Sequence, residues 1–176
     1  YRKEDVLVSC GAKHSLYNIL QAVVNPGDEV VIPAPYWVSY ADMALLAGGA
    51  PRLIPSAESA GFRISPEQLA AALTPRTRVF FLNSPCNPTG ACYNREELLA
   101  LAAVLEKHAC LILADDIYEQ IVYDGFEGHY TLTLSPALRG GLGTCRALEF
   151  RRLSNTVDPT RPGAIIPYRG DSTLFV

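Results

Sequence analysis

Short apolar runs alternate with segments of helical spacing along the first 116 residues of this chain. The runs are bounded by Gly, Pro, Asn and Asp, which is typical of strands. One of them is apolar almost throughout, as in strands buried on both faces of a parallel sheet. Five runs predict strands, at residues 6–9, 29–34, 51–55, 78–84 and 109–116.

Four segments between these strands predict helices. The first has an apolar stripe from Leu16 to Val23, and the second is expected at 38–46. Ser65 and Asn94 each stand three residues before a Gln or a Glu, which is the capping-box pattern that starts the third and fourth helices. Because strands and helices alternate, the sequence predicts an α/β fold with three αβα layers around a mostly parallel sheet.

The character of the chain changes after about Arg139. The segment 139–176 contains several Arg and no Lys, and its apolar positions follow neither the helical nor the strand period. We therefore divide the chain after residue 138 and do not expect the tail to continue the sheet. We interpret the tail as a disordered segment or as out-of-frame translation. The chain also begins at Tyr1 without a Met, and we expect it to be a piece of a longer protein.

Composition narrows the class of protein. Apolar residues make up 49% of the chain and charged residues 19%, the profile of a soluble globular protein. The net charge of −3 gives no basic surface for nucleic acid, and no apolar run is long enough to span a membrane. The cysteines are odd in number and never form a Cys-x-x-Cys pair, which argues against a disulfide framework and a metal site. The same cysteine pattern makes a reducing cytoplasm the expected location, and the first residues show no secretory h-region.

Unusual residues follow four of the predicted strands, at the positions where open parallel sheets bind ligands. Gly11, Ala12 and Lys13 lead from the first strand into a helix. This arrangement either presents backbone N–H groups to a phosphate or is a plain turn. Trp37, with Tyr40 close by, follows the second strand and is either a platform for a flat ring or a core aromatic.

The other two strand ends are richer in polar groups. The loop 83–90 contains two Asn-x-Pro or Asn-Pro elements, which indicate a rigid loop around a cis X–Pro bond that directs an Asn side chain. The last predicted strand ends at Asp115 and Asp116, with Tyr118 close behind. A buried acidic pair must meet a cation or a hydrogen-bond donor, or become neutral. A protonated ring nitrogen would satisfy it, and the alternative is an acidic cluster at a helix N-terminus.

Together these elements resemble the class I aminotransferases of fold type I, and most of all their prokaryotic-type aspartate aminotransferase branch. The resemblance extends from about Tyr1 to Pro136 and is carried by SCGAKHSLYN, NPGDEVVIPAPYWVSYADM, NSPCNPTGACYN and LADDIYEQIVYDG. It implies that 1–138 is a partial large domain that binds pyridoxal 5′-phosphate (PLP).

The resemblance also implies roles for residues on the first two strand ends. Gly11, Ala12 and Lys13 match the first part of the family's phosphate-binding turn. Trp37 matches the aromatic residue that stacks on the cofactor ring and borders the substrate.

Three further residues match family positions around the cofactor ring. Asn87 matches the Asn that hydrogen-bonds the phenolic oxygen of the ring and contacts the substrate, and Tyr118 matches the Tyr that reaches the same oxygen. Asp115 matches the carboxylate that keeps the pyridine nitrogen protonated, which makes the ring a better electron sink.

The resemblance further implies a Schiff-base lysine in a Ser-x-x-Lys or Ser-Lys motif after the strand that ends at Asp115. The lysines of this chain are Lys3, Lys13 and Lys107, so we assign no catalytic residue and expect the chain alone to be inactive. The stretch 148–153 can be encoded so that another reading frame spells Gly-Val-Ser-Lys-Thr. That coincidence is the basis of the out-of-frame interpretation, under which Arg151 and Arg152 have no function of their own.

The implied function of the parent protein is transfer of an amino group between an amino acid and a 2-oxo acid. Aspartate and 2-oxoglutarate are the expected substrates and a homodimer is the expected assembly, with neither nucleic acid nor membrane as a partner. One alternative is a non-catalytic module that binds PLP or a protein partner through the same loops. Another is a nucleotide-binding oxidoreductase, which the sequence disfavours because no Gly-x-Gly-x-x-Gly follows the first strand.

Overall fold

A computed structural model of the chain describes residues 6–118, 121–126, 145–150 and 164–167. A short 3₁₀ helix at Glu58–Ala60 lies between the third strand and the third helix. In chain order the other elements are β1 (Val6–Ser9), α1 (Ala12–Val23), β2 (Glu29–Ala34), α2 (Ser39–Leu46), β3 (Ala50–Pro55), α3 (Pro66–Ala72), β4 (Thr77–Asn83), α4 (Arg95–Leu105), β5 (Cys110–Asp115), β6 (Cys145–Phe150) and β7 (Ala164–Pro167).

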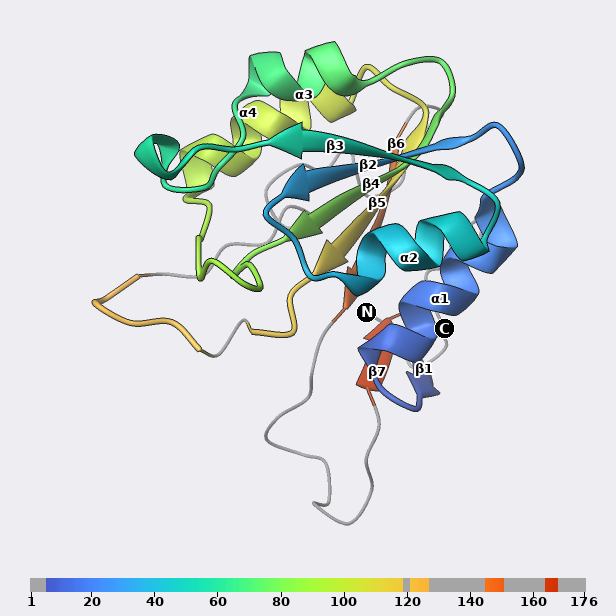
Figure 1. The fold of residues 1–176 in the computed structure, drawn as a ribbon. Helices are drawn as coiled ribbons and strands as arrows, with labels where there is room; N and C mark the ends of the chain where they lie inside the picture. The colour runs from blue at the N-terminus through green and yellow to red at the C-terminus, as the bar shows by residue number, and fades with distance from the viewer. Residues whose placement is uncertain (1–5, 119–120, 127–144, 151–163, 168–176) are drawn as a thin grey trace.

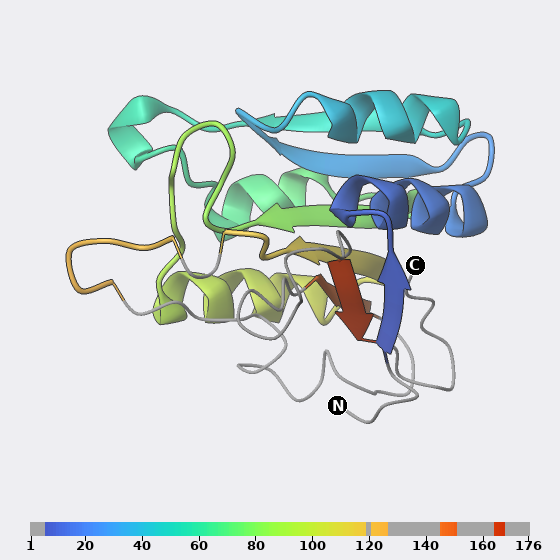
Figure 2. The ribbon, with the colours of Figure 1, turned by 90° about the horizontal axis from the view of Figure 1, so that it is seen from below.

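In the described residues the main sheet has five strands in the order β3-β2-β4-β5-β6, and the pairings between them are parallel. Helices α3 and α4 cover one face and α1 and α2 cover the other (Figure 1). A separate antiparallel pair joins β1 to β7, and the two strands lie side by side in Figure 2. This arrangement confirms the predicted three-layer α/β fold.

Each face of the sheet has its own apolar core, because alternate residues of a strand point to opposite faces. Along β4, Val79 and Phe81 pack against α1 and α2, whereas Phe80 and Leu82 pack against α3 and α4. All four side chains are buried. Strands buried on both faces explain the continuous apolar run in the sequence.

Local signals placed two helices correctly. Ser65 and Asn94 each accept a hydrogen bond from the backbone N–H three residues on, while the side chains of Gln68 and Glu97 bond back to the N-cap N–H. Both predicted capping boxes are therefore confirmed. The predicted second helix begins one residue later than expected, at Ser39. Within the described residues no helix is long and apolar enough to cross a membrane.

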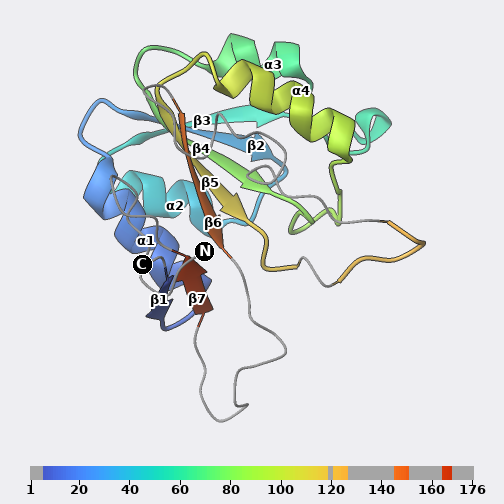
Figure 3. The same ribbon diagram turned by 180° about the vertical axis from the view of Figure 1, so that it is seen from behind.

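The expectation that the tail does not continue the sheet is wrong for Cys145–Phe150. This segment forms β6, which pairs in parallel with β5 over all six residues and lies at the edge of the sheet in Figure 3. The physical reason is that ladder hydrogen bonds are made by the backbone, so an open strand edge can accept a partner without a regular apolar period. Arg151 and Arg152 lie outside the described residues.

Candidate functional site

The candidate site lies at the carboxyl ends of the parallel strands, and 'this edge' of the main sheet refers to these strand ends. Asn83 and Asp115 are Cα partners in the ladder between β4 and β5, so the loops that follow these two strands start side by side. The loop from Pro35 to Val38 follows β2, the other neighbour of β4. Three of the four polar strand ends are thus gathered at one edge, as the parallel topology predicts.

Asp115 is a deeply buried carboxylate at this edge, with 3% of its surface exposed. The hydroxyl of Tyr40 donates a hydrogen bond of 2.6 Å to Oδ2 of Asp115. The Ile117 N–H donates to Oδ1 over 3.3 Å. Burial raises the pKa of Asp115, and the hydrogen bonds from Tyr40 and Ile117 oppose that rise. Among the described residues no Arg or Lys forms an ion pair with this carboxylate.

The loop after β4 is fixed to Asp115 through Asn83. The side-chain amide of Asn83 donates to the carbonyl of Asp115 over 2.7 Å, and its Oδ1 accepts from the Asn87 N–H over 2.8 Å. Nδ2 of Asn87 lies 3.5 Å from the hydroxyl of Tyr118, at the outer limit of a hydrogen bond. Asn87 and Tyr118 are therefore close enough for both to donate to a single acceptor.

The peptide bonds before Pro85 and Pro88 are cis, which confirms that the loop 83–90 is built around cis X–Pro bonds. A third cis bond precedes Pro35 at the end of β2, where no sequence signal predicted one. Ser84 connects this loop to the residues before α4, because its hydroxyl accepts a hydrogen bond of 3.1 Å from the Tyr93 N–H.

Aromatic rings form the wall on the α2 side of Asp115. Tyr40 stacks on Phe81 with ring centroids 4.4 Å apart and an angle of 20° between the ring planes. Trp37 meets Tyr40 edge to face, with centroids 5.4 Å apart and planes at 88°. Nζ of Lys13 lies 4.8 Å from the centroid of the Trp37 ring, a cation–π contact that joins the turn before α1 to this wall.

The turn before α1 is the fourth strand end. Gly11 has a φ of 90°, which a residue with a side chain rarely adopts, and its N–H bonds to the carbonyl of Ser9. The Ser9 hydroxyl donates to the carbonyl of Gly11 and also contacts the hydroxyl of Ser15. Among the described residues, no N-cap side chain bonds to the first turn of α1, in which Ala12 and Lys13 lie. A Cβ at Gly11 would meet nothing within 4 Å, so the turn faces open space.

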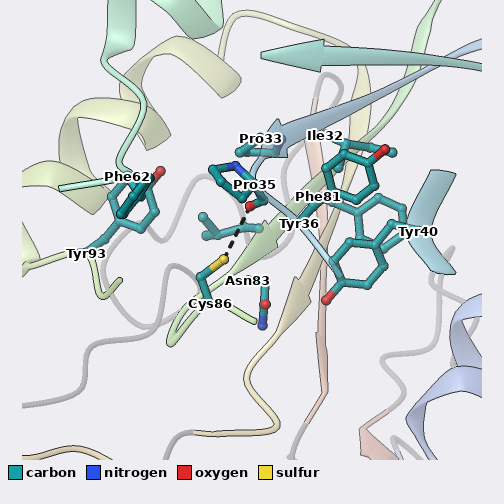
Figure 4. Close-up of a pocket in the computed structure, with 11 residues that line it drawn as sticks. Ile32, Pro33, Pro35, Tyr36, Tyr40, Phe62, Phe81, Asn83, Cys86 and Tyr93 are labelled. Atoms are coloured by element: carbon teal, nitrogen blue, oxygen red, sulfur yellow. Dashed lines mark hydrogen bonds between the residues drawn. The ribbon is translucent and has the colours of Figure 1, made fainter. Parts of the chain in front are cut away.

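A small cavity borders the same edge. It lies between Phe62 and Tyr93 on one side and Phe81 and Tyr40 on the other, and the Cys86 thiol points across it to the carbonyl of Pro35 (Figure 4). Its volume of about 20 Å³ is enough for a water molecule but not for a cofactor. A ring that contacted Asp115 would have to lie outside this cavity.

The described contacts link most of the predicted site residues into one path. It runs from Lys13 through Trp37 and Tyr40 to Asp115, and from there through Asn83 and Asn87 to Tyr118. The predicted set omitted two members of this path, Tyr40 and Asn83. The only sequence signals for them were the position of Tyr40 beside Trp37 and the position of Asn83 at a strand end.

The family of the chain follows from comparison with known proteins. The family model for "Aminotransferase class I and II" matches residues 1–145. The chain belongs to this family. An aspartate/prephenate aminotransferase of Cereibacter sphaeroides is 50% identical over 150 residues, which cover 85% of this chain and 38% of that protein. An aspartate aminotransferase of Geobacillus stearothermophilus is 48% identical over 139 residues, which cover 79% of this chain and 35% of that protein.

The fold leads to the same family. The crystal structure of the aspartate aminotransferase from Rhizobium meliloti matches with a TM-score of 0.86 and 40% identity, and covers 96% of this chain and 41% of that chain. The chain thus spans about two-fifths of the length of such relatives. Class I and II aminotransferases use PLP, so the residues at this edge can be weighed as a cofactor site.

Proposed function

We propose that this chain carries the PLP-binding edge of an aminotransferase large domain. The observation that carries the proposal is the buried Asp115 carboxylate, which has two hydrogen-bond donors and no cationic partner among the described side chains. Such a group is unfavourable in an apolar interior unless a cation or a further donor reaches it. The protonated nitrogen of a pyridine ring meets that requirement.

The other residues fit the remaining parts of the same ring. Asn87 and Tyr118 are close enough to donate to one phenolic oxygen, and Trp37 adds an aromatic ring on the α2 side of Asp115, in contact with Tyr40. The uncapped first turn of α1, with Lys13, suits a phosphate because it combines free N–H groups with positive charge. The cofactor, when bound, acts as the electron sink for the carbanion at the amino acid's α-carbon.

The proposed reaction of the whole protein moves an amino group between an amino acid and a 2-oxo acid. Aspartate is the first candidate substrate, because the similar proteins are named aspartate or aspartate/prephenate aminotransferases, and 2-oxoglutarate is the first candidate acceptor. We further propose a cytoplasmic homodimer. The only lysines of the chain are Lys3, Lys13 and Lys107, so the proposal for these 176 residues is binding without turnover.

Binding can be tested through Trp37, the single tryptophan of the chain. Pyridoxamine 5′-phosphate is the better probe, because it has no aldehyde to react with surface lysines. It is expected to quench the fluorescence of Trp37 saturably, and Asp115→Asn should weaken binding about tenfold or more, since a hydrogen bond between charged groups is lost. Asp42→Asn, an identical change on the exposed side of α2, is the matched control and should bind as the parent chain does.

Equal binding by the parent chain and Asp115→Asn would show that the probe binds elsewhere, and the proposed site would be wrong. Absence of quenching at millimolar probe would exclude cofactor binding by this chain. A further measurement separates the enzyme from a binding module. If PLP bound at this site formed a borohydride-reducible link to a lysine and supported transamination, the proposal of binding without turnover would fail.

A further inference from the structure

The hydrogen bond of 2.6 Å between Tyr40 and Asp115 is among the shortest polar contacts described at the candidate site. Tyr40 lies in the first turn of α2 and is only 2% exposed. Its ring is held between Phe81, on which it stacks, and the edge of Trp37 (Figure 4 shows Tyr40 beside Phe81). Packing of the ring therefore fixes the position of the hydroxyl, whose hydrogen bond to Asp115 spans 75 residues of sequence.

We propose that Tyr40 is a positioning residue, whose hydroxyl keeps Asp115 ionised and holds its Oδ2 in one orientation. This inference rests on the proposed function, in which Asp115 faces a protonated ring nitrogen. In an apolar interior the proton shared by such a pair can lie on the nitrogen or on the carboxylate. A donor to the carboxylate favours the ionised form, so the proton remains on the nitrogen.

The groups around the pair leave this role to Tyr40. Burial is the main cause that raises the pKa of the Tyr40 hydroxyl, and its neighbours Asp115, Cys86 and Tyr118 raise it further. Tyr40 therefore remains a neutral donor to higher pH than an ordinary tyrosine does. Cys86 and Tyr118 are themselves acids, so neither supplies a positive charge that would stabilise the ionised form of Asp115. Within the part of the chain that the structure describes, the Ile117 N–H is the other donor to Asp115, at the longer distance of 3.3 Å.

The direct test is the titration of the Asp115 carboxyl carbon by ¹³C NMR in the chain without cofactor. Tyr40→Phe removes the donor and keeps the ring between Phe81 and Trp37. We expect it to raise the midpoint by about one pH unit, because a hydrogen bond to a charged group changes acid dissociation about tenfold. The matched control is Tyr93→Phe, which removes another buried hydroxyl that contacts the Ile64 N–H, and it should leave the midpoint unchanged. An equal midpoint in the parent chain and Tyr40→Phe would overturn the proposal.

A second measurement does not require Tyr40→Phe to fold. Replacing the tyrosines by 3-fluorotyrosine makes each hydroxyl a stronger donor at nearly constant size, so the Asp115 midpoint should move to lower pH. The same shift is expected in a Tyr93→Phe background. A shift that disappears in that background would assign the effect to Tyr93 and sink the inference.

The last measurement follows the proton in the complex with ¹⁵N-labelled pyridoxamine 5′-phosphate. In Tyr40→Phe the ring nitrogen signal should move toward the unprotonated position, while in Tyr93→Phe it should stay. Unchanged signals in both variants, with binding intact, would reject the role of Tyr40 and leave the proposed function standing. If the parent chain does not bind the probe, the proposed function fails, and the cofactor-free titration alone decides whether Tyr40 keeps Asp115 ionised.

Discussion

The strands of the main sheet have a buried carboxylate at their amino ends, Glu29, and another at their carboxyl ends, Asp115. We call these two sides of the sheet the amino edge and the carboxyl edge. The two carboxylates have different partners. At the amino edge, Glu29 is 5% exposed and is surrounded by donors. The hydroxyl of Thr74 donates to Oε2 over 2.7 Å, and the Arg76 guanidinium donates twice to Oε1, over 2.6 and 3.2 Å. Arg52 adds a weaker ion pair at 3.9 Å.

At the carboxyl edge, Asp115 is as deeply buried as Glu29 but has fewer partners. Its carboxylate accepts from Tyr40 and Ile117, and no cationic side chain among the described residues reaches it. Hydrogen bonds from Thr74, and then from Arg76, lower the pKa of Glu29 below its ordinary value of 4.5. Burial instead raises the pKa of Asp115.

This difference separates a carboxylate whose partners lie within the chain from the one that we propose to be functional. Glu29 already has the donors and the positive charge that an ionised group needs, so its role is complete within the chain. Asp115 lies in an apolar setting without a cationic partner among the described residues. This lowers the stability of the chain and leaves the carboxylate able to bind a cation. A buried acid alone therefore does not indicate a site, whereas a buried acid without a cationic partner is a candidate for one.

The largest effect on this comparison is expected from Glu29→Gln. The amide cannot serve Arg76 and Thr74 as a charged acceptor, so the free energy of unfolding should fall by about 2 kcal/mol at pH 7, as measured by urea denaturation. Because the pKa of Glu29 is lowered in the folded state, its contribution is present above 4.5 and is lost as the pH falls through the folded pKa.

The parent chain and Glu29→Gln should accordingly converge in stability in acid. Glu67→Gln is a suitable control, because Glu67 also has a lowered pKa but lies on the exposed start of α3. If the free energies of unfolding of the parent chain and Glu29→Gln differed by a constant amount from pH 7 down to pH 3, the shape of the Glu29 side chain, and not its charge, would stabilise the amino edge.

Asp115→Asn should raise, and not lower, the free energy of unfolding of the chain without cofactor. The pKa of Asp115 is raised in the folded state, so the native chain loses stability as the pH rises from the ordinary value of 3.8 through the folded value. Asparagine has the same shape and carries no charge to bury. It should increase the free energy of unfolding by on the order of 1 kcal/mol at pH 7 and have no effect in acid. A loss of stability at pH 7 would mean that Asp115 holds the fold together as Glu29 does.

Most of the fold could be predicted because its signals are local. The N-caps Ser65 and Asn94 and the apolar runs of β2, β4 and β5 lie within the segments that they specify. Strand β6 was missed because its pairing with β5 joins segments far apart in the chain and depends on backbone groups that every residue carries. The short helix at Glu58–Ala60 has no capping side chain that the sequence could reveal.

The site divides in the same way. Polar residues after buried strands stand out against the apolar pattern, and the resemblance to the family selected Asp115, Asn87 and Tyr118 among them. Tyr40 did not stand out, because it also serves as a core aromatic in the first turn of α2. Only the three-dimensional structure shows that its hydroxyl reaches Asp115, the contact that gives the carboxyl edge its character.

The smallest effects should distinguish the two arginines at the amino edge. Arg76→Ala removes two hydrogen bonds to Glu29 and should lower the free energy of unfolding by about 1 kcal/mol, whereas Arg52→Ala should cost about 0.3 kcal/mol. Both values are modest because these side chains are 71% and 43% exposed, so water and salt screen their charges. Urea denaturation in low and high salt measures both differences.

Arg78→Ala provides the control, because Arg78 donates to the uncharged carbonyl of Val23 and its contribution should change little with salt. Equal losses for Arg76→Ala and Arg52→Ala, both removed by salt, would show that Glu29 responds to the surrounding charge and not to directed hydrogen bonds. The contrast between Glu29 and Asp115 rests on the number of directed hydrogen bonds that each carboxylate accepts. With that outcome, the contrast would be only a difference in the electrostatic potential at the two carboxylates.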